Sequence, residues 1–156
     1  MTTTISKVDT QWDTKKLHEV NTRVFASMYI SAFQALSKQG EKSFDEFEAT
    51  MRNFKIEAYK NLGVKTPLDL VRIIAETEFN LFGSQIEITG DEKKATLKYN
   101  SCGIWDAMQK LHKFSPEQEE LMGKNCQASH SKLAEAFGMK FECDMTNDTY
   151  SMTFSK

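Results

Sequence analysis

The chain of 156 residues lacks the long apolar runs that a membrane protein or an exported protein needs. No stretch approaches the roughly eighteen uninterrupted apolar residues of a membrane-spanning helix. The polar start, residues 1–16, has no apolar core of the kind found in signal peptides. These absences predict a cytoplasmic protein with no membrane partner.

An excess of charge of one sign is also missing, since 20 basic side chains face 22 acidic ones. Without a basic stripe to neutralise phosphates, no nucleic-acid partner is expected. Hydrophobic residues make up 40% and charged residues 27%, which is typical of a globular domain. We expect one domain over residues 1–156, with a flexible segment 1–12, a helical part 13–82 and a second part 83–156.

Apolar residues recur at helical spacing between Asp13 and Gln39 and again after Gly40. Ser43 followed by Glu46 predicts a capping box at the start of the second helix. The apolar face of the first helix is expected to hold Leu17, Val20, Val24, Met28, Ala32 and Ala35, and to be widened by Phe25, Tyr29, Phe33 and Leu36. That of the second is expected to hold Phe44, Phe47, Met51, Phe54, Ala58 and Leu62.

A third helix is predicted from Thr66 and Pro67, an N-cap and first-position pair, to Phe82. It is apolar nearly all round, which predicts a central place in the core or cover by a second subunit. The helical surface from Leu17 to Leu36 is another candidate interface.

After Gly83 the apolar spacing changes from helical to alternating. Two hairpins are predicted, separated by helices over Gly103–Lys113 and Pro116–Phe137, and the second hairpin turns at residues 146–148. The order is ααα-ββ-αα-ββ, which is α+β. Because each hairpin has one polar face, the strands are expected to form a four-stranded antiparallel sheet with helices on one face.

The three cysteines lie in the last third of the chain, and their odd number argues against a disulfide framework. Cys126 and His130 are four residues apart on one helix face, Cys143 points toward the core, and Cys102 precedes a helix that favours a thiolate. Three thiols and an imidazole match the composition of a tetrahedral zinc site, and thiolates also suit iron. The set Cys102, Cys126, His130 and Cys143 is therefore a candidate metal site.

Two other interpretations of these residues stay open. In the first, Cys126 and Cys143 are small hydrophobic residues of the core with no chemical role, since free cysteine is among the most buried residue types. Alternatively, Cys102 is a catalytic nucleophile with His112 or His130 as its base. Trp105 and Tyr99 flank Cys102 and are candidates for the wall of a pocket that binds a cofactor or small molecule.

The C-terminal half resembles a known family, through Asn100-Ser101-Cys102, Asn125-Cys126 with His130, and the segments 143–148 and 152–154. Residues 84–154 are similar to the 4-vinyl reductase domain and to the L-2-amino-thiazoline-4-carboxylic acid hydrolase-like family. The resemblance implies a small-molecule-binding domain that dimerises through helices, and hydrolase activity in some relatives.

Three functional hypotheses follow. The first is a binding protein for a metal, zinc or iron, or for a small ligand, with a Cys/His site between helix and sheet. The second, which the resemblance implies, is a small-molecule hydrolase acting on a cyclic C–N bond through a cysteine or a metal. The third is a structural interaction subunit, and a homodimer is expected in each case.

Overall fold

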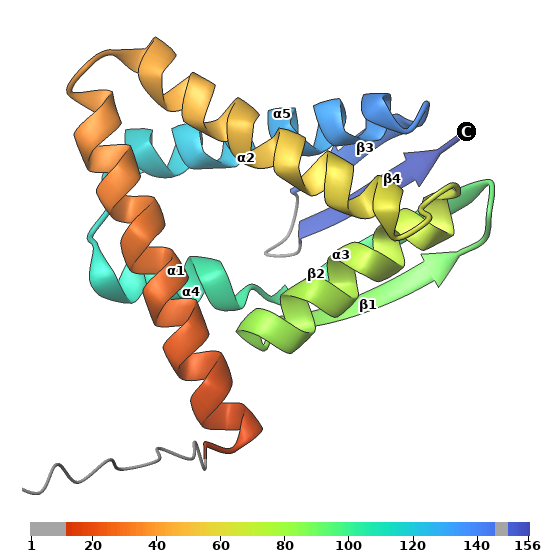
Figure 1. Ribbon diagram of the computed structural model, residues 1–156, viewed down its shortest axis with the longest axis horizontal. Helices are drawn as coiled ribbons and strands as arrows, with labels where there is room; N and C mark the ends of the chain where they lie inside the picture. Colours follow the sequence, from red (N-terminus) through yellow and green to blue (C-terminus); the bar gives the residue numbers. More distant parts are fainter. Residues whose placement is uncertain (1–11, 146–149) are drawn as a thin grey trace, which may run out of the picture.

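The computed structural model describes residues 12–145 and 150–156 (Figure 1). Its elements follow the order α1 (Thr14–Ser37), α2 (Glu41–Asn61), α3 (Pro67–Phe82), β1 (Gln85–Gly90), β2 (Lys94–Ser101), α4 (Gly103–Leu111), α5 (Pro116–Ala136), β3 (Lys140–Asp144) and β4 (Tyr150–Ser155). This order confirms the predicted α+β class and the sequence ααα-ββ-αα-ββ. The predicted turn at 146–148, and residues 1–11 of the segment expected to be flexible, lie outside the described residues.

The four strands form one antiparallel sheet in the order β1-β2-β4-β3. Leu97 of β2 lies opposite Met152 of β4, and both are fully buried under α3 and α5. The opposite face of the sheet is polar, and there the hydroxyls of Thr96 and Thr153 lie 2.8 Å apart. The predicted sheet with helices on one face is confirmed.

The start of α3 is as predicted: Thr66 and Asp69 form a reciprocal capping box, with Pro67 at the first position. The predicted capping box at the start of α2 is wrong, because that helix begins at Glu41 and has no side-chain cap. Gly40, at φ +112°, turns the chain so that its carbonyl already accepts the N–H of Ser43 at 3.1 Å. Ser43 therefore lies inside the first turn and not before it.

The buried face of α1 differs from the predicted stripe, except at Phe33, which is buried as expected. Thr22, Ala26, Ile30 and Phe33 face the core, whereas Met28 is 69% exposed and Val24 is also exposed. The small side chain of Ala26 allows α4 to lie close against this face. The hydroxyl of Thr22 donates a hydrogen bond to the carbonyl oxygen of His18 at 2.5 Å, so this polar group is paired within the helix. The buried stripe of α1 is therefore set by its packing against α4.

The predicted stripe of α2 is likewise wrong for its second half. Phe44, Ile56 and Tyr59 are buried, while Phe54 is 74% exposed and Leu62 is exposed too. In α3 the residues Leu70, Val71 and Ile74 pack on the sheet, but the end of the helix leaves Phe79 exposed. In the part of the chain that the structure describes, no helix combines the length and the apolar character needed to span a membrane.

Candidate functional site

Cys126 and His130 lie one turn apart on α5, as their spacing predicts, with Cys126 Sγ 3.6 Å from His130 Nδ1. The same Nδ1 is 2.8 Å from the carbonyl oxygen of Cys126. Because a carbonyl only accepts, Nδ1 carries the proton of the neutral ring and Nε2 holds the lone pair. Burial, with a smaller contribution from the charge of Lys55, lowers the pKa of His130 to about 4.

Tyr150 of β4 joins this pair to a second thiol. Its Oη lies 3.4 Å from Cys126 Sγ and also hydrogen-bonds Cys143 of β3. The ring of His130 stacks on Phe141, the neighbour of Cys143 two positions back along β3. We call Cys126, His130, Cys143 and Tyr150 the thiol cluster; it lies between α5 and the sheet.

Both thiols of the cluster are protonated near neutral pH. Burial raises the pKa of Cys126, and the hydrogen bond from Tyr150 only partly opposes that rise. Burial also raises the pKa of Cys143, with the same opposing hydrogen bond. The cluster is therefore made of weak nucleophiles but soft donor atoms, which a metal ion deprotonates when it binds.

The described residues contain no group of three or more His, Cys, Asp or Glu side chains placed to hold a metal ion as the structure stands. Within the thiol cluster the Tyr150 hydroxyl contacts both sulfurs, so a metal ion would have to displace it. Of the four predicted ligands, Cys126 and Cys143 nevertheless meet at that hydroxyl, and His130 lies beside Cys126.

Cys102, the fourth predicted ligand, is the N-cap residue of α4, and its side chain makes no capping hydrogen bond there. Burial raises its pKa to about 12, so the thiolate expected from its helix N-terminal position does not form near neutral pH. The cost of desolvating the thiolate outweighs the favourable effect of the helix N-terminus on the pKa of Cys102.

The predicted partners of Cys102 lie elsewhere. His112 caps the opposite end of α4, where its Nδ1 is 3.4 Å from Gln34 Nε2, so Cys102 and His112 do not form a dyad. Trp105 stacks on Phe114 in the core between α1 and α4, whereas Tyr99 packs on Tyr150 in the core over the sheet. These two aromatic residues therefore do not wall one shared pocket.

Sequence reasoning missed three polar residues around the cluster: Tyr150, Glu78 and Lys55. Glu78 is a buried carboxyl on α3 that accepts the Ser84 hydroxyl at 3.2 Å, and burial raises its pKa. Its charge acts on Cys102 and Cys126. Nothing in the sequence distinguishes Glu78 from Asp69 and Glu76, the other acidic residues of α3.

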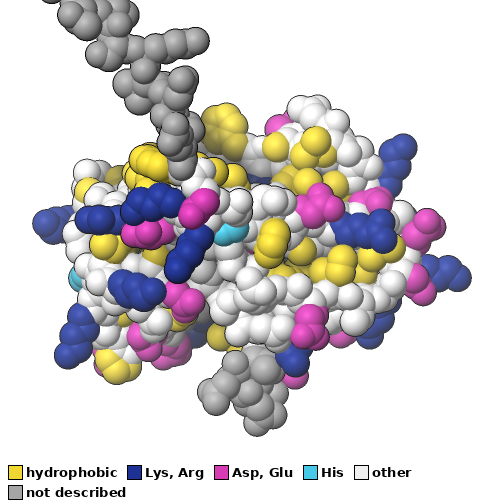
Figure 2. All heavy atoms as spheres, turned by 90° about the horizontal axis from the view of Figure 1, so that it is seen from below, with side chains coloured by type: hydrophobic (Ala, Val, Ile, Leu, Met, Phe, Trp, Pro, Cys, Tyr) yellow, Lys and Arg dark blue, Asp and Glu magenta, His cyan; other side chains and the backbone are white. Residues whose placement is uncertain are grey.

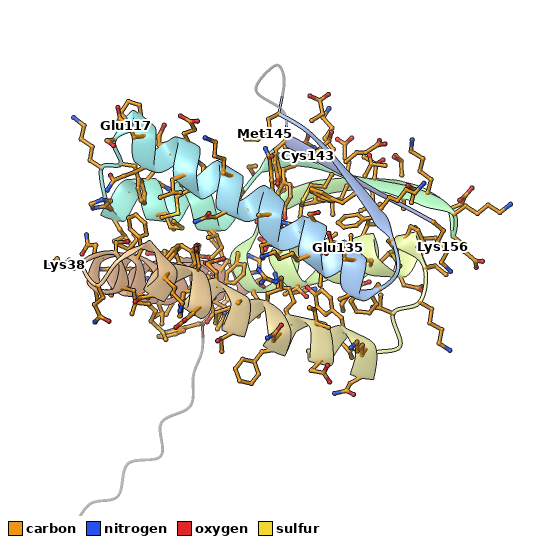
Figure 3. The ribbon with its side chains drawn as sticks, turned by 90° about the horizontal axis from the view of Figure 1, so that it is seen from above. Lys38, Glu117, Glu135, Cys143, Met145 and Lys156 are labelled. Carbon is orange, nitrogen blue, oxygen red and sulfur yellow. The ribbon has the colours of Figure 1, made fainter. Side chains whose placement is uncertain are left out.

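The thiol cluster reaches the surface through Cys143. A hollow of about 430 Å³ lies between α5 and β3, and Gln127, Ser131, Phe141 and Cys143 are among the residues that line it. Figure 3 shows Cys143 on β3 beside α5. A small molecule or ion therefore meets Cys143 before the other members of the cluster.

Comparison with protein-family models and with curated proteins finds no match to this chain. The resemblance to the 4-vinyl reductase domain stays a hypothesis, and function is argued below from the geometry of the site.

Proposed function

We propose that this protein is a binding module for a thiophilic ligand, with Zn²⁺ as the first candidate, and that the ligand enters the thiol cluster between α5 and the sheet. One observation supports this most directly. The thiols of Cys126 and Cys143 meet at the Tyr150 hydroxyl, and His130, whose Nε2 holds the lone pair of the ring, lies one helical turn from Cys126. Thiolate sulfur and imidazole nitrogen are preferred ligands of zinc, and ferrous iron accepts the same donors.

The protonation of the cluster suits such a ligand. A pKa of about 4 keeps the His130 ring neutral at physiological pH, which is the form that binds metals. The thiols of Cys126 and Cys143 would each release a proton on binding, so affinity should rise with pH. Their sulfurs and the imidazole supply three protein ligands and leave a fourth position for water or a small molecule, because Cys102 stands at the start of α4, outside the contacts of the cluster.

Hydrolysis of a small cyclic C–N compound is the alternative, and an open fourth position is what a metal-dependent form would need. The thiol-dependent form has less support, since the pKa of Cys102 is about 12 and no imidazole contacts it among the described residues. A binding role comes first because the buried, neutral cluster offers ligands for an ion but no activated nucleophile.

The test uses reduced, metal-free protein titrated with Co²⁺ as a spectroscopic substitute for zinc, followed by competition with Zn²⁺. We expect one ion per chain, an intense thiolate-to-cobalt absorption band, and release of about two protons. Cys126→Ser and His130→Gln should each weaken binding by at least tenfold, as loss of one ligand does.

Cys102→Ser is the matched control, because it removes a buried thiol that lies outside the proposed ligand set. It should bind Co²⁺ like the parent protein. Absence of the charge-transfer band, with all three thiols reacting equally fast with and without zinc, would reject metal binding. An unchanged band in Cys126→Ser would reject this site.

We further propose that the chain forms a homodimer through the exposed apolar faces of α1 and α2. Met28 and Phe54 are 69% and 74% exposed, and Val24, Met51 and Leu62 are also exposed. Large apolar side chains exposed in this number on two helices are candidates for an interaction surface. Light scattering should give twice the chain mass for the parent protein and one chain mass for Phe54→Asp. The cytoplasm is the proposed location, because all three cysteines are free thiols.

A further inference from the structure

We infer that a second site, separate from the thiol cluster, binds a small organic anion in the groove between α1 and α4. The groove encloses about 580 Å³ and is lined by side chains of both helices and by the end of α3. This volume is within the range of small-molecule pockets, about 300–1,000 Å³. No residue of the groove belongs to the thiol cluster.

Two glycines bring the three elements together and fix the shape of the groove. Gly83 ends α3 at φ +68°, and a Cβ there would lie 2.9 Å from the His18 ring of α1. At the start of α4, a Cβ on Gly103 would lie within 2.1 Å of the Phe82 carbonyl oxygen. The Gly103 N–H also donates to the buried Ser84 hydroxyl at 3.0 Å. The base of the groove is therefore a tightly packed junction.

The groove is lined by two cationic and two anionic side chains, and the cations are the groups that can pair with an anionic ligand. Arg23 of α1 and Lys110 of α4 line it, and neither takes part in any of the ion pairs that the described residues form within 4 Å. Of the two carboxylates, Glu19 is paired with Lys16 at 3.1 Å. Asp106 lies in the first turn of α4, where a negative charge interacts with the helix dipole.

The remaining surface of the groove favours a ligand whose anionic group is attached to an apolar portion. Phe82, Ala107 and Leu111 contribute carbon surface beside the two cations, and Leu111 is 44% exposed. Basic and acidic side chains alternate over the face of the molecule in Figure 2, so no large area of one sign sets the charge of a ligand. The charge of the ligand is set instead by Arg23 and Lys110, which both line the groove. A carboxylate with a short aliphatic or aromatic chain fits this combination.

The experiment uses hexanoate as the probe, with hexanol and hexylamine as neutral and cationic probes of matched chain length, and inorganic phosphate as an anion without a chain. Binding is followed by backbone amide shifts in the full chain. Hexanoate should shift signals of residues 18–23 and 103–111 and should bind more tightly than the other three. High salt should weaken it, because both cations are at the surface.

Arg23→Gln and Lys110→Gln should each weaken hexanoate binding about three- to tenfold, the range for loss of a charged partner in a partly exposed site. Lys113→Gln removes a neighbouring charge outside the groove and should have no effect. Asp106→Asn should tighten hexanoate binding. The inference would be overturned if hexanol or hexylamine bound as tightly as hexanoate. It would also be overturned if Asp106→Asn weakened hexanoate binding, or if neither Arg23→Gln nor Lys110→Gln changed it.

Discussion

The His130 ring donates its Nδ1 proton to the carbonyl of Cys126, 2.8 Å away, while the Cys126 sulfur lies 3.6 Å from the same nitrogen. The hydrogen bond within the helix fixes the tautomer and leaves Nε2 as the basic nitrogen. A thiol and an imidazole that lie this close would form an ion pair in an aqueous cleft, but here burial opposes both charges. The pair is therefore a neutral donor set whose chemistry depends on what enters.

The neutral ring makes stability depend on pH. The pKa of His130 is about 4 in the folded protein and about 6.5 when unfolded, so the unfolded chain binds the proton more readily between these values. Stability should be constant above about pH 6.5 and should fall by up to about 3 kcal/mol as the pH drops to about 4. Urea unfolding at several pH values measures this. His130→Gln should lose most of the slope and Ser131→Ala should keep it; a His130 ring that titrates near 6.5 by NMR would contradict the assignment.

Tyr150→Phe removes the hydroxyl that contacts both thiols of the cluster. We expect a loss of about 1 kcal/mol of stability, the usual net value of one such hydrogen bond. The pKa of Cys126 should rise further, because the hydrogen bond from Tyr150 currently lowers it. Alkylation rates measured against pH report that shift. An unchanged rate profile for Cys126 would show that the phenol does not reach its sulfur in solution.

The three thiols should differ in their reactivity toward iodoacetamide. Cys143 lines the open hollow beside α5, whereas Cys102 stands at the start of α4, outside that hollow, and Cys126 lies deeper in the cluster. Mass spectrometry should detect the first modification at Cys143, and Cys143→Ser should remove the fast phase. All rates should rise with pH, since burial raises the pKa of every cysteine. First modification at Cys102 would show that the junction before α4 opens.

The order of elements was readable from the sequence because it depends on local signals. The Thr66-Pro67 start of α3 and the alternation of the strands need no tertiary information, and both proved correct. The buried faces of α1 and α2 were not readable, since each helix carries apolar residues on more than one side. Which side is buried depends on partners distant in sequence, as with α4, which packs against Ala26.

The candidate site was predictable only in part, for the same reason. The contact between Cys126 and His130 follows from helical periodicity alone. The arrival of Tyr150 depends on the register of β4, and the position of Cys102 depends on how closely α4 approaches α3. Neither the register of β4 nor the distance between α4 and α3 can be predicted from the spacing of residues in the sequence.

Close approach of α4 to α3 makes Gly103 intolerant of a side chain. A Cβ there would meet the Phe82 carbonyl oxygen at 2.1 Å, so Gly103→Ala should cost about 1–3 kcal/mol through displacement of the helix. Gly123→Ala is the matched control on α5, where the added methyl would find Met145 Cε at an ordinary 3.6 Å. That variant should be stabilised by about 0.5–1 kcal/mol from helix propensity. If the two substitutions changed the free energy of unfolding in urea equally, the junction between α3 and α4 would be able to accommodate the added methyl group.

The two faces of α1 give a final test of the packing. Met28 lies on the exposed stripe, so Met28→Lys should change the stability of a single chain by less than about 0.5 kcal/mol. Ala26, completely buried against α4, has no room for a larger side chain, and Ala26→Lys should unfold the domain because it also buries a charge. Circular dichroism distinguishes the two outcomes. A folded Ala26→Lys protein together with an unfolded Met28→Lys protein would mean that α1 packs through the stripe first suggested by its sequence.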